Sequence, residues 1–207
     1  MSKKPIIVFE GIECSGKSLH SQNVANYLKK KGIKFIKIRE PGGNENSEKI
    51  RKLILNDNSK FNKVTDLLLY FAARNENIEN TIKQNLGKKV ILIDRFKDST
   101  VAYQHYGMNI NINFINMINK FLIKKIKVNF TFLHLVNKKN IRLRLSSRKK
   151  LNRYDKFKMQ FYTKVQNGFI KIANKNKRKF LKINSNHDIA TNKKIIIDKI
   201  NELVKWI

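Results

Sequence analysis

The chain has 207 residues, enough for one domain with a sizeable hydrophobic core, and we expect a single domain over residues 1–207. Lys and Arg outnumber Asp and Glu by 45 to 15, so the formal net charge is +30. The single cysteine excludes a disulfide framework. No stretch is long and apolar enough to predict a membrane span, and the first apolar run begins too early for a signal peptide, so we expect a cytoplasmic protein without a membrane partner.

Two interpretations of the positive charge are open. Clustered Lys and Arg neutralise phosphates in proteins that bind nucleic acids. Here the excess is mostly Lys, dispersed along the chain and interleaved with Asn rather than with aromatic residues. We therefore favour a compositional trend with weak polyanion affinity, and we expect no specific nucleic acid as partner.

The first predicted strand, Ile6–Phe9, leads into residues 11–18, which fit the phosphate-binding pattern G-x-x-x-x-G-K-[ST]. A strand, a glycine turn and a helix in succession aim backbone N–H groups at one point, where the helix dipole adds positive potential. We expect Lys17 to reach the β- and γ-phosphates of a nucleoside triphosphate and Ser18 to help hold Mg²⁺. The alternative is a purely structural turn. The candidate ATP-binding loop is Gly11, Ile12, Glu13, Cys14, Ser15, Gly16, Lys17 and Ser18.

Four more apolar runs predict strands, at Phe35–Ile38, Val90–Ile93, Phe130–Leu135 and Phe180–Ile183. Longer segments with helical spacing separate them, which is typical of a doubly wound α/β fold with a parallel sheet. Ligands of such sheets bind at the carboxyl ends of the strands. Polar residues follow several of these runs, so a site is expected there.

Charged residues that follow the strands indicate binding sites for a metal ion and for a second anion. Asp94 ends the third apolar run, where P-loop enzymes often carry a carboxylate for Mg²⁺; a helix-capping role is the alternative. The planar guanidinium group suits phosphate, and the candidate arginines are Arg39, Arg51, Arg74 and Arg95.

A basic stretch at about residues 142–155 has the composition of a mobile lid that excludes water from a phosphoryl-transfer site. It contains arginines and hydroxyl residues but no glycine. For each arginine the alternative is a solvated helix face. The candidates are Arg144, Arg148 and Arg153.

Several short segments follow one another in an order and spacing similar to those of thymidylate kinases, which phosphorylate dTMP to dTDP with ATP. They are Phe9–Glu13, Arg39–Gly43, Tyr70–Arg74, Asp94-Arg95 and Tyr103-Gln104. The resemblance implies a three-layer P-loop kinase fold, in which a five-stranded parallel sheet is flanked by helices and carries a short basic lid. It also implies ATP and dTMP as substrates, Mg²⁺ as cofactor and a homodimer.

The resemblance further implies roles for single residues. Glu13 would lie near the sugar 3′-hydroxyl and the metal, which Ser18 and Asp94 also approach. Lys17, Asp94, Arg95 and Arg148 would form the catalytic group. The implied dTMP site consists of Glu13, Arg39, Pro41, Arg51, Tyr70, Arg74, Arg95, Thr100, Tyr103 and Gln104. Within it, Tyr70 would stack on thymine and Tyr103 would crowd the sugar 2′ position.

Position 14 adds a distinction within the family. Some members carry a catalytic arginine in the phosphate loop and others supply it from the lid; this chain has Cys14. The resemblance therefore implies that a lid arginine supplies the catalytic charge, as in the bacterial type, and Arg148 is the first candidate. Arg144 and Arg153 would bind ATP. Two other functions stay open: a related kinase of broader acceptor range, and a basic P-loop protein that binds nucleic acid.

Overall fold

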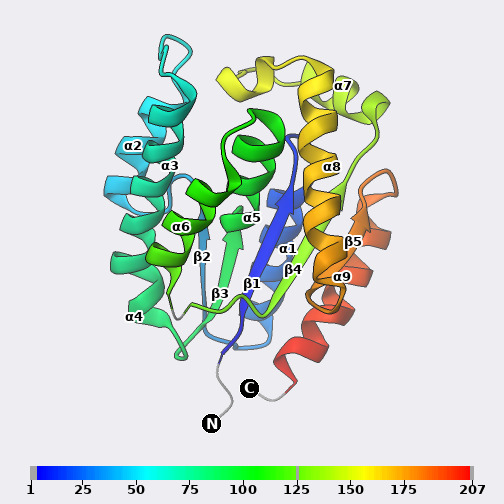
Figure 1. The fold of residues 1–207 in the computed structure, drawn as a ribbon. Coiled ribbons are helices and arrows are strands. Elements are labelled where there is room, and N and C mark those ends of the chain that lie inside the picture. The colour runs from blue at the N-terminus through cyan, green and yellow to red at the C-terminus, as the bar shows by residue number, and fades with distance from the viewer. Residues whose placement is uncertain (1–3, 125, 206–207) are drawn as a thin grey trace.

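A computed structural model describes residues 4–124 and 126–205. Its centre is a five-stranded parallel sheet with strand order β2-β3-β1-β4-β5 (Figure 1). The strands are β1 (Ile6–Gly11), β2 (Phe35–Arg39), β3 (Val90–Asp94), β4 (Phe130–Leu135) and β5 (Phe180–Asn184). All five predicted strands are present, and the predicted α/β class is confirmed.

Helices connect the strands. They are α1 (Lys17–Lys30), α2 (Glu45–Leu55), α3 (Lys63–Asn77), α4 (Lys83–Asn85), α5 (Lys97–Thr100), α6 (Ile112–Ile123), α7 (Lys138–Ser146), α8 (Met159–Lys175) and α9 (Ile189–Val204). Two π-helical turns, η1 (Ile78–Ile82) and η2 (Val101–Gly107), and two 3₁₀ turns, η3 (Arg153–Lys156) and η4 (Lys177–Lys179), complete the described elements. None of the helices in residues 4–124 and 126–205 is long and apolar enough to cross a bilayer.

The sheet is buried on both faces because successive side chains of a strand point to opposite sides. Ile7 and Phe9 of β1 pack with α1 and α9 on one face. Ile6 and Val8 pack with η1 and the end of α6 on the other. The expected three layers are thus present, and a run of apolar residues without alternation is the pattern that such a strand requires.

The topology gathers the polar strand ends. The chain builds β1, β2 and β3 on one side of the sheet and then crosses β1 to add β4 and β5. The parallel register places Phe9 opposite Asp94 and Arg39 beside Asp94. The glycine loop after β1 therefore lies at the point where the strand order reverses, which is where open α/β sheets bind ligands.

Four of the nine described α-helices begin with an amide cap. Asn44, Asn62, Asn111 and Asn137 each accept a hydrogen bond from a backbone N–H of the helix that follows, at the start of α2, α3, α6 and α7. The Asn side chain satisfies N–H groups that the first turn leaves unpaired. Part of the high Asn content thus defines where helices start.

Candidate active site

The loop between β1 and α1 requires glycine at positions 11 and 16. Gly11 and Gly16 have φ angles of +145° and +86°. A Cβ atom on Gly11 would lie 2.6 Å from the backbone oxygen of His134 on the neighbouring strand. The loop therefore sits directly on β4, and the N-terminus of α1 faces the space above it.

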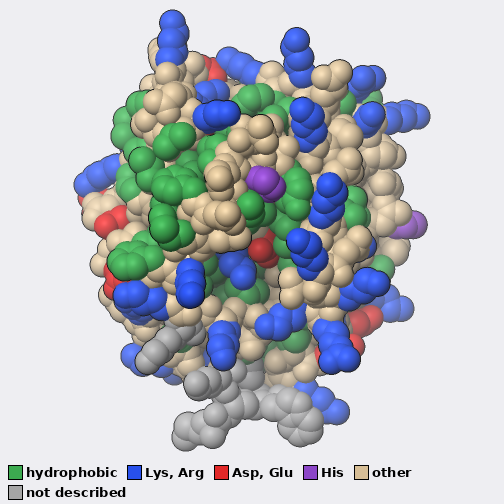
Figure 2. All heavy atoms as spheres, viewed as in Figure 1, with side chains coloured by type: hydrophobic (Ala, Val, Ile, Leu, Met, Phe, Trp, Pro, Cys, Tyr) green, Lys and Arg blue, Asp and Glu red, His purple; other side chains and the backbone are tan. Residues whose placement is uncertain are grey.

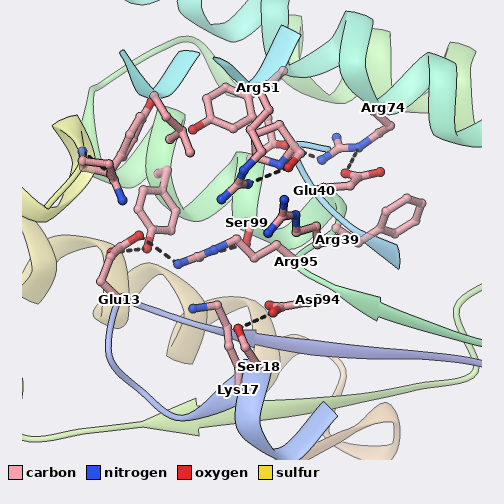
Figure 3. A pocket seen from close by; sticks show the side chains of 18 of the residues that line it. Glu13, Lys17, Ser18, Arg39, Glu40, Arg51, Arg74, Asp94, Arg95 and Ser99 are labelled. Carbon is pink, nitrogen blue, oxygen red and sulfur yellow. Dashed lines mark hydrogen bonds and ion pairs between the residues drawn. The ribbon is translucent and has the colours of Figure 1, made fainter. Parts of the chain in front are cut away.

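Lys17 and Ser18 begin α1 and point into that space (Figure 3). The Nζ of Lys17 donates to the backbone oxygen of Ile12 at 3.1 Å. Burial lowers the pKa of this ammonium group to about 8. Ser18 Oγ donates to Asp94 Oδ2, while Asp94 Oδ1 is buried without a hydrogen-bond partner. A hydroxyl and a carboxylate with a free oxygen fit Mg²⁺, which typically takes one or two protein ligands together with substrate phosphates.

Glu13 is fixed by two residues of the β3 side of the site. Arg95 donates from Nη2 to Glu13 Oε1 at 2.8 Å, and Tyr103 Oη donates to Glu13 Oε2 at 2.6 Å. The second Arg95 nitrogen, Nη1, donates to the backbone oxygen of Gly11 at 2.8 Å. The three side chains thus form one rigid unit that ties the phosphate loop to β3 and η2.

Arg74 is almost fully buried, and each of its three guanidinium nitrogens contacts a different side chain. Its Nε pairs with Glu40 Oε2, Nη1 donates to Asn119 Oδ1 and Nη2 donates to Thr100 Oγ1, each at 2.8 Å. This arginine therefore connects α3 with α5, α6 and the loop after β2. That loop contains a cis peptide bond before Pro41, whose backbone oxygen accepts from Arg51 Nη1 at 2.6 Å.

These residues surround one cavity at the carboxyl end of the sheet (Figure 3). Its lining contains all ten residues of the predicted dTMP site: Glu13, Arg39, Pro41, Arg51, Tyr70, Arg74, Arg95, Thr100, Tyr103 and Gln104. Gln104 Nε2 is buried and has no hydrogen-bond partner in the protein. Arg39 lies at the rim, half exposed, and pairs with Glu48 at 3.0 Å. The structure thus brings together side chains from four separate parts of the sequence, at residue 13 and within residues 39–51, 70–74 and 95–104.

A second cavity lies on the other side of the phosphate loop and is lined by Cys14, Ser15, Gly16 and Arg144, among others. Arg144 donates to the backbone oxygens of Cys14, at 2.9 Å, and Ser185, at 2.7 Å. Three side chains line both cavities: Lys17, Ser18 and Arg148. They form the common wall between the two.

Three of the residues predicted to bind ATP lie outside the lining of both cavities. Gly11 and Ile12 line neither cavity and offer backbone oxygens to Arg95 and Lys17. Arg153 also lines neither cavity, because its guanidinium group binds Asp66 of α3 and the backbone oxygen of Ser59. The structure therefore does not bring Arg153 to the phosphate loop, and its expected contact with ATP stays a prediction.

Sequence reasoning missed two buried polar residues. Glu10 accepts from the backbone N–H groups of Phe96, at 2.9 Å, and Ser99, at 3.1 Å, and so joins β1 to α5. Burial, assisted by the charge of Asp98, raises the pKa of Glu10 to about 8. Asn119 interrupts the apolar face of α6, and that interruption was the available signal for a buried polar contact.

Two stacked imidazoles lie beneath the phosphate loop. The rings of His20 and His134 are 5.4 Å apart, centroid to centroid, and nearly parallel. Burial lowers the pKa of His134 well below its ordinary value, and the charges of His20 and Lys17 act in the same direction. His134 is therefore neutral in the folded protein at neutral pH.

Because the buried His134 stays neutral in the folded protein, we expect the free energy of unfolding to depend on pH. Because the unfolded chain protonates His134 below about pH 6.5 and the folded chain does not, this contribution is complete above that pH and is lost as the pH falls, by up to about 1.4 kcal/mol per pH unit. Urea unfolding of the wild type and His134→Gln between about pH 5.5 and 7.5 should give a stability difference that shrinks at low pH. A constant difference for His134→Gln would contradict the prediction.

A P-loop on the central strand of a 2-3-1-4-5 parallel sheet, with a second cavity across the common wall, defines a nucleotide kinase of the P-loop class. The family model described as thymidylate kinase matches residues 9–196. The chain therefore belongs to the thymidylate kinase family.

Individual relatives match the chain over 81% to 97% of its length. The chain is 37% identical to the thymidylate kinase of Sulfurihydrogenibium sp. (strain YO3AOP1), over 95% of this chain and 96% of that protein. It is 39% identical to that of Thermosipho africanus (strain TCF52B), over 81% of this chain and 83% of that protein. The crystal structure of thymidylate kinase from Ehrlichia chaffeensis matches with a TM-score of 0.79 and 31% identity, covering 97% of this chain and 99% of that chain.

Proposed function

We propose that the chain transfers the γ-phosphoryl group of ATP to dTMP and so forms dTDP and ADP. The observation that carries this proposal is the common wall of Lys17, Ser18 and Arg148. A donor in the P-loop cavity and an acceptor in the opposite cavity would meet at these two cations and one hydroxyl. Phosphoryl transfer requires mainly that two phosphates are held in line and that their charge is neutralised.

In this proposal an oxygen of the dTMP phosphate attacks the γ-phosphorus, and the bond to the β–γ bridging oxygen breaks. Lys17 and Arg148 balance the charge on the transferring group, and Arg95 orients the acceptor phosphate. Mg²⁺, held by Ser18 and Asp94 and near Glu13, would neutralise phosphate charge when bound. Support comes from the unpartnered oxygen of Asp94 and the two hydrogen bonds that fix Glu13.

The acceptor cavity offers groups for the base and the sugar. Gln104 Nε2 is an unused donor, and Thr100 and Arg74 lie beside it in the lining. We propose that they read the polar edge of thymine, with Tyr70 against the ring. Tyr103 would exclude a ribose 2′-hydroxyl, because its own hydroxyl is fixed on Glu13.

The acceptor screen tests this function. A coupled assay with ATP should give turnover with dTMP, and turnover with dUMP that is lower by about 10–200-fold, because the two differ by one methyl group. Lys17→Ala should abolish turnover while the circular dichroism spectrum stays unchanged. Turnover with AMP or dGMP but not with dTMP would overturn the proposal, and equal turnover with several acceptors would indicate a kinase of broader range.

We further propose a homodimer formed through α2, α3 and α6. Hydrophobic side chains gather over these helices in Figure 2. The large exposed ones are Leu53, Val64, Leu68, Met117 and Phe121. Exposed apolar residues shared by three neighbouring helices are typical of a protein interface, and the family resemblance implies a homodimer formed through helices on one face of the sheet.

A further inference from the structure

The segment that follows Arg148 is fastened to the acceptor side of the site by one buried carboxylate. Asp66 lies in the first turn of α3 and is 3% exposed. Its Oδ2 accepts from Tyr154 Oη at 2.6 Å, and its Oδ1 pairs with Arg153 Nη2. Arg153 Nη1 also donates to the backbone oxygen of Ser59 at 3.2 Å. We call the contact of Asp66 with Arg153 and Tyr154 the lid latch.

The lid latch is directly connected to Arg148. Arg148 Nη1 pairs with Asp155 Oδ1, and Asp155 follows Tyr154 in the single turn η3. Asp155 Oδ2 accepts from the backbone N–H of Asn152 at 3.0 Å and from its Nδ2 at 2.7 Å. Asp155 is buried and cannot rotate without losing these bonds. The orientation of Arg148 is therefore fixed by the same turn that Asp66 holds.

The other end of the lid latch reaches the acceptor cavity. Tyr70, one turn after Asp66 on α3, lines that cavity together with Tyr154. The two rings meet edge to face at 6.0 Å. A nucleotide that displaces Tyr70 or α3 thus acts on Tyr154, and through η3 on Arg148.

We propose that Asp66 is a positioning residue that couples occupancy of the acceptor site to the placement of Arg148. The proposal rests on the function proposed above. Asp66 touches neither cavity; it acts through Tyr154 and Arg153. Small displacements of a group that must approach the reacting phosphates are costly, because an error of about 1 Å can reduce the rate 100-fold.

Asp66→Asn tests the coupling, since it keeps the shape and removes the charge. We expect kcat to fall by roughly 100-fold with little change in the KM for dTMP. Asp57→Asn is the matched control: it breaks the exposed ion pair of Asp57 with Lys156, at 2.6 Å, which reaches the same turn, and it should leave kcat unchanged. Tyr154→Phe supplies a second variant if Asp66→Asn does not fold, and it should lower kcat in the same way.

A double variant distinguishes a positioning role of Asp66 from a general loss of structure. If Asp66 acts through Arg148, then Asp66→Asn will not lower kcat further in an Arg148→Ala background. Additive losses would overturn the proposal, and so would an unchanged kcat of both latch variants. If the wild type itself fails to phosphorylate dTMP, the proposed function fails instead.

A binding measurement tests the coupling between the two nucleotide sites without requiring turnover. In the wild type, dTMP should tighten binding of a non-hydrolysable ATP analogue, and the ratio of the two Kd values should approach one in Asp66→Asn. An unchanged ratio in that variant would contradict the proposed coupling.

Discussion

Arg148→Ala is expected to lower kcat by roughly 10³–10⁵-fold, the range that an arginine directed at a transferring phosphoryl group contributes. Among the described residues, Arg148 is the one arginine that lines both cavities. Its guanidinium group is paired with the buried Asp155. Steady-state kinetics with ATP and dTMP measure the effect, and the KM values should change much less than kcat.

The matched control for this prediction is Arg142→Ala. Arg142 lies on α7, the helix that precedes Arg148 in the chain, is exposed and lines neither cavity. It should keep wild-type kcat. If Arg148→Ala stays active while Arg144→Ala does not, the catalytic charge comes from Arg144, whose contact with Cys14 already places it at the phosphate loop.

Arg74→Met is expected to lower the free energy of unfolding by about 3–5 kcal/mol, because it leaves a buried carboxylate without its partner. Arg74 and Glu40 are both nearly inaccessible to solvent. Burial raises the pKa of Glu40 above its ordinary value, and Arg74 opposes that rise. Without Arg74 the pKa of the Glu40 carboxyl should rise further. Denaturant unfolding of the variant measures the loss.

Two further variants check the cause of that loss. Arg74→Met/Glu40→Gln should be less destabilised than the sum of the two single variants, because neither partner is then left as an unpaired charge. Arg39→Ala breaks an exposed pair with Glu48 and should cost less than about 1 kcal/mol. A similar loss for Arg39→Ala and Arg74→Met would contradict the role of burial.

The sequence predicted the strands and the phosphate loop because their signals are local. Apolar runs such as Val90–Ile93 identify strands buried on both faces, and the glycines at 11 and 16 are required by positive φ angles within one loop. The residues of the predicted dTMP site were proposed from motif order, and the parallel register brings the ends of β1, β2 and β3 together.

The position of Arg153 could not be predicted in this way. Its partner Asp66 lies 87 residues earlier in the chain and is brought to it by the packing of η3 on α3. Glu10 is another such case, since its hydrogen-bond donors, Phe96 and Ser99, follow a different strand. The partners of these charges depend on tertiary packing, which the spacing of residues along one segment does not encode.

The asparagine caps have a consequence for the molecular surface. Since neutral amides start four of the nine described α-helices, no carboxylate is needed as a cap at those four ends. Several of the 15 acidic residues lie in the interior instead, namely Glu10, Glu13, Glu40, Asp66 and Asp155. The charge on the outer surface is therefore even more positive than the composition of the whole chain indicates. Repulsion between like-charged surfaces should limit non-specific aggregation in dilute salt, and rising ionic strength should progressively weaken that repulsion.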